Sequence, residues 1–263
     1  MSETDLEIYM FPCLRDNYGF LIHDRRARVT AAIDTPDAGA IEKALKAKGW
    51  KLTHILNTHH HADHTGGNAE LKARTKCTVV GPRREVNKIP GLDIPLADGD
   101  IFRFGSHMAQ VIDVPGHTNG HIAYWFAEDR VAFVGDTLFA MGCGRLFEGT
   151  PQTMWRSLQK LMALPEDTVL YCAHEYTEAN GAFALSVEPE NRDLRDRMDE
   201  VRRLRAGGRP TVPTTLGLEL RTNPFLRPMS RWIRGRLGLP DADPVEVFAE
   251  LRQRKDSFVP PAA

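Results

Sequence analysis

The sequence predicts an α/β domain that extends to about residue 175, followed by a smaller helical domain. Short apolar runs bounded by turn residues recur through the first part, and such runs are typical of buried strands. Segments with apolar residues at helical spacing lie between them. After about residue 176 the strand-like runs stop, while helical spacing continues in a strongly charged segment.

Six apolar runs are the predicted strands. Turn signals such as Asp98-Gly99-Asp100 and Pro115-Gly116 separate them. The runs are Phe20–Ile22, Thr53–Asn57, Cys77–Val80, Val111–Val114, Val131–Val134 and Thr168–Tyr171.

Four segments show helical spacing. A stripe at Ile41, Ala44 and Leu45 is predicted to end near Gly49. A second stripe follows Thr150, a predicted N-cap, with Pro151 at the first helical position. Later in the chain, Asp243 to Glu246 reads as a capping box. The apolar residues of the last three segments are Met154, Leu158, Leu161 and Met162; Leu194, Met198, Val201 and Leu204; and Val247, Phe248 and Leu251.

Composition restricts the class of protein. The chain has 263 residues, of which 42% are hydrophobic and 26% charged, an ordinary globular mixture. The net charge of -1 provides no global field for nucleic acid or an acidic membrane. The acidic start Met1–Glu7 lacks the apolar segment of a signal peptide, and no apolar run reaches transmembrane length. The four scattered cysteines form no CxxC pair. We therefore expect a cytoplasmic protein that binds neither nucleic acid nor membrane. Composition does not indicate the oligomeric state, for which a monomer is the expectation.

The strongest chemical signal is the histidine-rich string Thr58–Gly67. Four of the ten histidines lie within six positions, and Asp63 lies among them. Imidazole and carboxylate groups are the ligands that zinc, iron and manganese accept. The string therefore predicts a metal site at His59, His61, Asp63 and His64, whereas His60 is predicted to point away because side chains alternate in extended chain.

Other ligand-type residues follow the ends of predicted strands. His117, Asp136 and His174 each come directly after an apolar run, as His59 does. If these runs are neighbouring strands, their ends converge on one edge of the sheet core. Five histidines and two carboxylates are too many for one ion and suit two. A carboxylate is the natural bridge, because its two oxygens can address two cations.

With these candidate ligands, the chain resembles the metallo-β-lactamase superfamily, and within it the glyoxalase II family. The string at 58–64 carries the superfamily resemblance, together with the segments Pro115–His121, Gly135–Phe139 and His174–Thr177. The segment Gly142–Thr150 and a basic motif at 252–256 make the glyoxalase II resemblance more specific.

The resemblance implies an αββα sandwich, with a catalytic domain at 1–175 and a helical glutathione-binding domain at 176–263. It implies two divalent metal ions, zinc in the first instance, with iron or manganese as alternatives. His59, His61 and His117 would hold the first ion. Asp63, His64 and His174 would hold the second, and Asp136 would bridge them. Asp63 and Asp136 are thereby the expected catalytic carboxylates.

The resemblance also implies a substrate. S-(2-hydroxyacyl)glutathione thioesters, such as S-D-lactoylglutathione, would be hydrolysed by a metal-bridging hydroxide to a 2-hydroxy acid and glutathione, in methylglyoxal detoxification. The expected substrate-binding residues are Arg145, Phe147, His174, Tyr176, Arg252 and Lys255. Arginine and lysine suit the two carboxylates of glutathione. Some family members carry Lys and Tyr where this chain has Arg145 and Phe147, so no hydroxyl can donate a hydrogen bond at position 147.

Three alternatives stay open. One is another hydrolase of the superfamily, acting on a lactone or β-lactam; the second is a mono-iron persulfide dioxygenase. The third is a metal-binding sensor without turnover. Cys143 lies in a Gly-Cys-Gly turn, but no neighbouring base in the sequence would activate it as a nucleophile. No role is predicted for His23, His54, His107 and His121.

Overall fold

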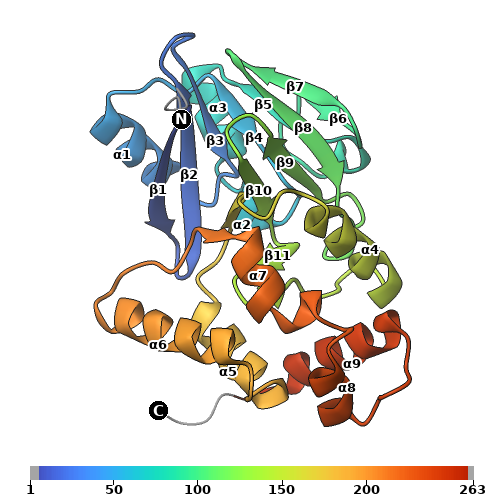
Figure 1. Cartoon of the computed structure of the whole chain (residues 1–263). Helices are drawn as coiled ribbons and strands as arrows, with labels where there is room; N and C mark the ends of the chain where they lie inside the picture. Colours follow the sequence, from blue (N-terminus) through green and yellow to red (C-terminus); the bar gives the residue numbers. More distant parts are fainter. Residues whose placement is uncertain (1–5, 260–263) are drawn as a thin grey trace. The chain divides into compact units, whose positions relative to one another are not determined.

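The computed structural model describes residues 6–259 and divides into two compact units (Figure 1). The first unit comprises the chain up to Val114 together with Thr118–Gly135. The second comprises Pro115–His117 and the chain from Asp136 onwards. The segment Met1–Asp5, which is most of the acidic start discussed above, lies outside the described residues.

The first unit contains a six-stranded mixed sheet in the order β1-β2-β3-β4-β5-β6. The pairs from β1 to β3 are antiparallel, and those from β3 to β6 are parallel. The strands are β1 (Leu6–Cys13), β2 (Asn17–Asp24), β3 (Val29–Ile33), β4 (His54–Leu56), β5 (Thr78–Pro82) and β6 (Ile94–Leu96).

Four further strands of the first unit pair as an antiparallel meander in chain order. These are β7 (Ile101–Phe104), β8 (His107–Asp113), β9 (Ile122–Phe126) and β10 (Val131–Gly135). The unit also contains α1 (Ala38–Lys48), α2 (Ala62–Thr65), α3 (Asn68–Thr75) and the short 3-10 helix η1 (Arg83–Glu85).

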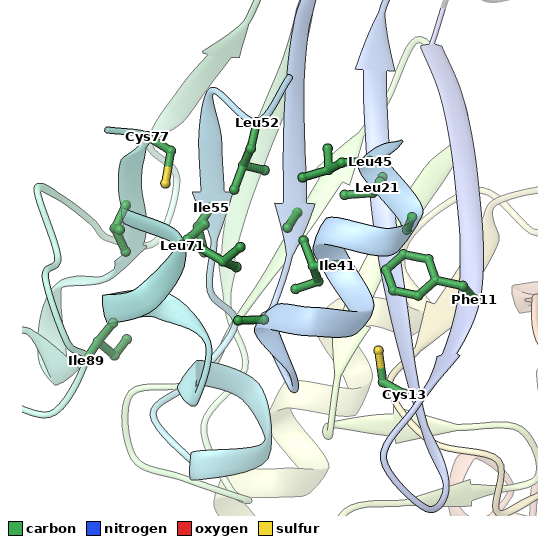
Figure 2. Packing of buried hydrophobic residues seen from close by; sticks show 14 residues of the cluster. Phe11, Cys13, Leu21, Ile41, Leu45, Leu52, Ile55, Leu71, Cys77 and Ile89 are labelled. Carbon is green, nitrogen blue, oxygen red and sulfur yellow. The ribbon is translucent and has the colours of Figure 1, made fainter. Parts of the chain in front are cut away.

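Helices α1 and α3 pack on one face of the six-stranded sheet (Figure 2). Ile41 and Leu45 of α1 point toward Leu21 of β2, and Leu71 of α3 lies near Ile55 of β4. These side chains are at least 93% buried. Removing a leucine-sized side chain from water stabilises the fold by roughly 1.5–3 kcal/mol. This layer therefore anchors β4, the strand after which the predicted ligands His59 and His61 follow.

The opposite face of that sheet packs against the meander. Phe20 of β2 contacts Phe133 of β10 with ring centroids 5.7 Å apart, and His54 of β4 contacts Phe104 of β7 at 5.8 Å. Phe20 and Leu21 point to opposite faces because side chains alternate along a strand. The first unit thus consists of helices, sheet and second sheet in successive layers.

The second unit is mostly helical. Its strands are β11 (Leu138–Phe139), β12 (Gly142–Cys143), β13 (Val169–Cys172) and β14 (Thr214–Thr215). In Figure 1, α5 and α6 lie side by side. Met198 and Val201 of α6 belong to a small buried cluster that also contains Met141. The helices are α4 (Pro151–Met162), α5 (Thr177–Val187), α6 (Arg192–Ala206), α7 (Leu216–Thr222), η2 (Pro224–Leu226), α8 (Arg231–Leu237) and α9 (Pro244–Ser257).

The predicted strands and helix ends are confirmed. All six apolar runs overlap strands, and α1 ends at Gly49 in the left-handed conformation that glycine favours. Thr150 caps α4, and Asp243 with Glu246 forms both hydrogen bonds of a capping box at α9. Further elements were not predicted: strands β1, β3, β6, β7, β9, β11, β12 and β14, and helices α2, α3, α5, α7 and α8.

Candidate metal centre

The first ligand set follows strand β4 in the first unit. The chain leaves β4 at Leu56, passes through His59 and His61, and enters α2, which carries Asp63 and His64. His59 and His64 are fully buried, whereas His61 and Asp63 are partly exposed. Buried imidazoles beside partly exposed ligands are suited to an ion that substrate can reach.

The ligand atoms of this set lie close together. His59 Nε2 is 3.0 Å from His61 Nδ1, and His64 Nε2 is 3.6 Å from Asp63 Oδ2. Two ligand atoms about 2.0–2.1 Å from one tetrahedral ion lie about 3.3 Å from each other. The observed separations therefore fit ligands that share an ion.

Asp34 orients the imidazole ring of His64 through its Nδ1 nitrogen. Its Oδ2 lies 2.8 Å from His64 Nδ1, and its two oxygens also accept hydrogen bonds from the Thr58 N–H and hydroxyl, each at 2.8 Å. A carboxylate on one imidazole nitrogen fixes the tautomer and leaves the other nitrogen for metal. Asp34 holds a positive φ of 56° at the end of β3, a sparsely populated conformation for a non-glycine residue. Asp34 is therefore a positioning residue for this ligand set.

Two further residues support this ligand set. The Asn17 side chain donates to the Asp63 carboxylate at 3.2 Å and to its backbone carbonyl at 3.3 Å. The fully buried His121 ring stacks on His59 with centroids 4.6 Å apart. These contacts restrict the directions in which Asp63 and His59 can point.

The second ligand set lies in the second unit and is centred on Asp136. One carboxylate oxygen, Oδ2, lies 3.3 Å from His117 Nε2, and the other, Oδ1, lies 3.4 Å from His174 Nε2. All three side chains are buried. A carboxylate with a different imidazole at each oxygen is arranged to bridge two cations.

A backbone carbonyl holds His117 in place. His117 Nδ1 lies 2.9 Å from the Arg145 carbonyl oxygen, which leaves Nε2 directed toward Asp136. Gly144 permits this approach, because a Cβ there would lie 2.0 Å from the Asp136 carbonyl oxygen and 3.1 Å from His117 Nδ1. The glycine before Arg145 is therefore required by close packing.

The hairpin β11–β12 connects Asp136 to Arg145. Hydrogen bonds from the helical part of the second unit hold it in place. Asn223 donates to the carbonyls of Phe139 and Gly142, and the buried Glu219 carboxylate accepts from the Met141 N–H. Arg197 neutralises Glu219 at 2.5 Å. These contacts fix the hairpin that carries Asp136 at its start.

Two of the predicted substrate-binding residues present aromatic rings beside ligands. Tyr176 stacks on His174 with centroids 4.7 Å apart and planes 3° apart, and Phe147 contacts His117 at 5.1 Å. Phe147 is 61% exposed and Tyr176 37% exposed, so both rings are open to an incoming molecule.

The basic motif of α9 gathers around Asp256. Arg252 is buried, donates to the Cys143 carbonyl at 2.9 Å and forms two hydrogen bonds to Asp256 Oδ1. Arg145 Nε lies 4.0 Å from the same oxygen. Burial, followed by the charges of Arg252 and Arg145, lowers the pKa of Lys255 below its ordinary value. Excess positive charge in this motif favours an anionic ligand.

Cys143 is not an activated nucleophile. Burial raises the pKa of its thiol to about 11, and the neighbouring Arg252 only partly offsets this effect. The thiolate is the reactive form, so the Cys143 thiol stays inert at neutral pH.

The structure thus brings the predicted ligands together in two sets. His59, His61, Asp63 and His64 converge in the first unit, and His117, Asp136 and His174 converge in the second. Asp34 and His121 were not predicted. Asp34 directly follows the apolar run Val29–Ile33, the same signal that identified His117 and Asp136, and so could have been found.

Family models match nearly all of the chain. The model described as "Metallo-beta-lactamase superfamily" matches residues 24–174, and "Hydroxyacylglutathione hydrolase C-terminus" matches residues 175–258. The hydroxyacylglutathione hydrolase of Methylococcus capsulatus is 57% identical over 96% of this chain and 99% of its own length. That of Maricaulis maris is 56% identical over 97% and 100%.

Solved structures share the fold. ETHE1 from Myxococcus xanthus matches with a TM-score of 0.66 and 27% identity, over 95% of this chain and 99% of that protein. TTHA1623, solved in a di-iron-bound form, matches with a TM-score of 0.58 and 25% identity, over 84% of this chain and all of that protein. The predicted α/β fold class is confirmed. With histidine and aspartate groups that could hold divalent metals, and full-length relatives above half identity, the chain belongs to the hydroxyacylglutathione hydrolase family of the metallo-β-lactamase superfamily.

Proposed function

We propose that this protein hydrolyses S-(2-hydroxyacyl)glutathione thioesters, such as S-D-lactoylglutathione, to a 2-hydroxy acid and glutathione. The observation that carries the proposal is Asp136, whose two oxygens each face a different histidine nitrogen. Relatives named hydroxyacylglutathione hydrolase, matched over their full length, support the substrate class.

The proposed metal centre uses both ligand sets for one pair of divalent ions. His59, His61 and His117 would hold one ion, Asp63, His64 and His174 would hold the other, and Asp136 would serve both. The donor chemistry supports this assignment, since seven histidine and aspartate ligands suit two ions and exceed the needs of one. Zinc is the proposed metal, and mixed nitrogen and oxygen ligation is equally compatible with iron or manganese.

When bound, two such ions supply a hydroxide near neutral pH and polarise the thioester carbonyl. The protein's part is to orient the ligands and the substrate. Arg145 and Lys255 attract the carboxylates of glutathione, and Phe147 and Tyr176 provide apolar walls beside the ligands His117 and His174. Arg252 is buried against Cys143. It contributes to substrate binding by fixing the loop that precedes Arg145. The glutathione thiolate leaves without a protein acid, because thiols are far more acidic than alcohols.

We assign catalysis to a domain at residues 1–175 and glutathione binding to a domain at residues 176–263. The adjoining family matches at 24–174 and 175–258 support that boundary. We also propose a monomer in the cytoplasm, with no nucleic-acid or membrane partner. Among residues 6–259, no helix is both long and apolar enough to cross a bilayer.

The test is an assay of the purified protein with S-D-lactoylglutathione, with and without a chelator, alongside a metal count on the same sample. We expect rapid, chelator-sensitive thioester loss with about two metals per chain. Full metal occupancy without hydrolysis would overturn the substrate. Lactones and glutathione persulfide would then be the next substrates to assay, and inactivity toward all of them would favour a sensor.

A further inference from the structure

His60 is the one imidazole of the string 59–64 without a ligand role. It is partly buried, and its Nδ1 lies 3.1 Å from Oε1 of Glu85, a residue far along the chain in η1. Glu85 is only 2% exposed. Burying a carboxylate is costly unless polar groups stabilise it, so the surroundings of Glu85 require a physical explanation.

The same carboxylate oxygen holds a second segment. Glu85 Oε1 accepts a hydrogen bond from the Thr118 hydroxyl at 2.6 Å and another from the Gly120 N–H at 3.1 Å. Thr118 directly follows the ligand His117 in the chain. The loop leads into β9, and just before that strand the His121 carbonyl accepts a hydrogen bond from the Val114 N–H at 2.8 Å.

Close packing makes this loop conformation dependent on Glu85. A Cβ on Gly120 would lie 2.4 Å from Glu85 Cγ and 2.9 Å from its carboxyl carbon. Only glycine lets the backbone approach the carboxylate this closely. Glu85 and the loop 118–120 therefore fit together as one unit, with little freedom to shift.

We infer that Glu85 is a positioning residue for the metal centre. One buried carboxylate contacts His60, which lies between the ligands His59 and His61, and also fixes the backbone on the C-terminal side of the ligand His117. It thereby restricts the paths of two ligand-bearing segments at once. The inference rests on the proposed metal centre, and it gives His60 a role that the other histidines of the string do not share.

Residues that orient ligands without touching the metal change metal affinity about 10–100-fold when removed. We expect Glu85→Ala to weaken metal binding within this range and to lower kcat with little change in KM. Glu85→Gln keeps an acceptor oxygen for Thr118 and Gly120, so it should stay within about threefold of the wild-type affinity. Thr118→Val should weaken metal binding by about fivefold, as expected for one lost hydrogen bond.

The experiment measures zinc affinity by chelator competition, together with metal stoichiometry and thermal unfolding, for the wild-type protein and each variant. The matched control is Glu42→Ala, which removes a glutamate paired with Arg74 on the surface of α1. That variant should bind zinc like the wild-type protein. A cycle of Glu85→Ala, His60→Ala and the double variant should show non-additive losses of zinc affinity, since contacting residues are energetically coupled.

A purely structural role would lower the unfolding temperature of Glu85→Ala while leaving the zinc affinity of the folded protein unchanged, and this result would overturn the inference. If Glu85→Ala fails to fold, unchanged zinc affinity in both Thr118→Val and His60→Ala would do the same. A wild-type protein that binds no metal would instead overturn the proposed metal centre itself, and the positioning role with it.

Discussion

The two ligand sets are built in different ways. In the first unit, four proposed ligands lie between His59 and His64 on a short stretch after β4, and side chains such as Asp34 and Asn17 contact them. In the second unit, His117, Asp136 and His174 come from separate segments, and a backbone carbonyl orients His117. A side-chain support can be removed by one substitution, whereas a backbone support survives substitution of its residue. The two sets should therefore respond differently to mutation.

The largest effect is expected for Asp136→Ala. Its loss removes the acceptor that faces both His117 and His174, so both ions should be lost. Stabilisation of transition-state charge by metal is worth several kcal/mol, so kcat should fall by about 10³-fold or more. Asp63 is not the proposed bridging residue, so Asp63→Ala should retain about one ion per chain. Metal counting and steady-state kinetics test both; an active, metal-replete Asp136→Ala protein would refute the bridge.

The contrast between the two supports is tested by Asp34→Ala and Arg145→Ala. Loss of Asp34 leaves His64 Nδ1 without its carboxylate partner, so metal affinity should fall about 10–100-fold. Arg145→Ala keeps the carbonyl that His117 contacts, so metal affinity should be unchanged while KM rises. Chelator competition measures the affinities. Equal metal loss in the two variants would remove the distinction drawn between the ligand sets.

A smaller effect is expected for Lys255→Ala in the basic motif of α9. KM should rise about tenfold with kcat retained, as loss of ground-state binding predicts. Burial and the charges of Arg252 and Arg145 lower the pKa of Lys255, so its positive charge is lost at a lower pH than for an ordinary lysine. As pH increases, the KM of the wild-type protein should therefore begin to rise before the ordinary lysine pKa is reached. The variant should lack this rise. Lys160→Ala, at an exposed lysine of α4, is the control. A defect confined to kcat would argue against a binding role.

The smallest effect is expected on the free energy of unfolding and concerns Asp24. This residue of the first unit accepts hydrogen bonds from nearby loops and is remote in sequence from the proposed ligands. Burial alone raises the pKa of its carboxyl, but hydrogen bonds from Ser106, Ala27 and Arg26 outweigh burial and lower that pKa to about 2. Because the folded pKa lies below the unfolded value of 3.8, the carboxylate stabilises the fold above that pH. This stability is lost as pH falls from 3.8 toward 2.

Asp24→Asn should therefore cost about 1–2 kcal/mol of unfolding free energy at neutral pH, and the difference should vanish near the lower end of that range. Denaturant unfolding at several pH values measures it, while metal affinity should not change. A variant that loses metal at neutral pH would mean that the supports of the first unit are coupled beyond their direct contacts.

Much of the local structure could be predicted, because the physics involved is local. The end of α1 depends on Gly49, the start of α4 on Thr150 and Pro151, and the start of α9 on a capping box, all within a few residues. The candidate ligands could be named because a histidine or aspartate after an apolar run recurs four times along the chain, although each instance alone has an ordinary structural explanation. The same signal was present at Asp34 and was overlooked, since one aspartate after one strand has many ordinary explanations.

Other features depended on residues far apart in the sequence. The sequence predicts Arg252 as part of a basic substrate-binding motif, but it does not show that the fold places this guanidinium over Phe225 and against the Cys143 carbonyl. Likewise, nothing near Glu85 in the sequence indicates a partner for His60. Spacing along a helix gives the face on which a side chain lies, but not what that face meets.

The sequence by itself determined which residue types could bind metal, six of the strands, four of the helices and the change to a helical region after about residue 176, because periodicity, capping and ligand chemistry act over short stretches. Only the tertiary structure decided which carboxylates contact the proposed ligands or their chain neighbours, as Asp34 and Glu85 do, and which oxygen of Asp136 faces which histidine. These relations join segments separated by many residues, and their geometry depends on the packing of a whole core to within a few tenths of an ångström.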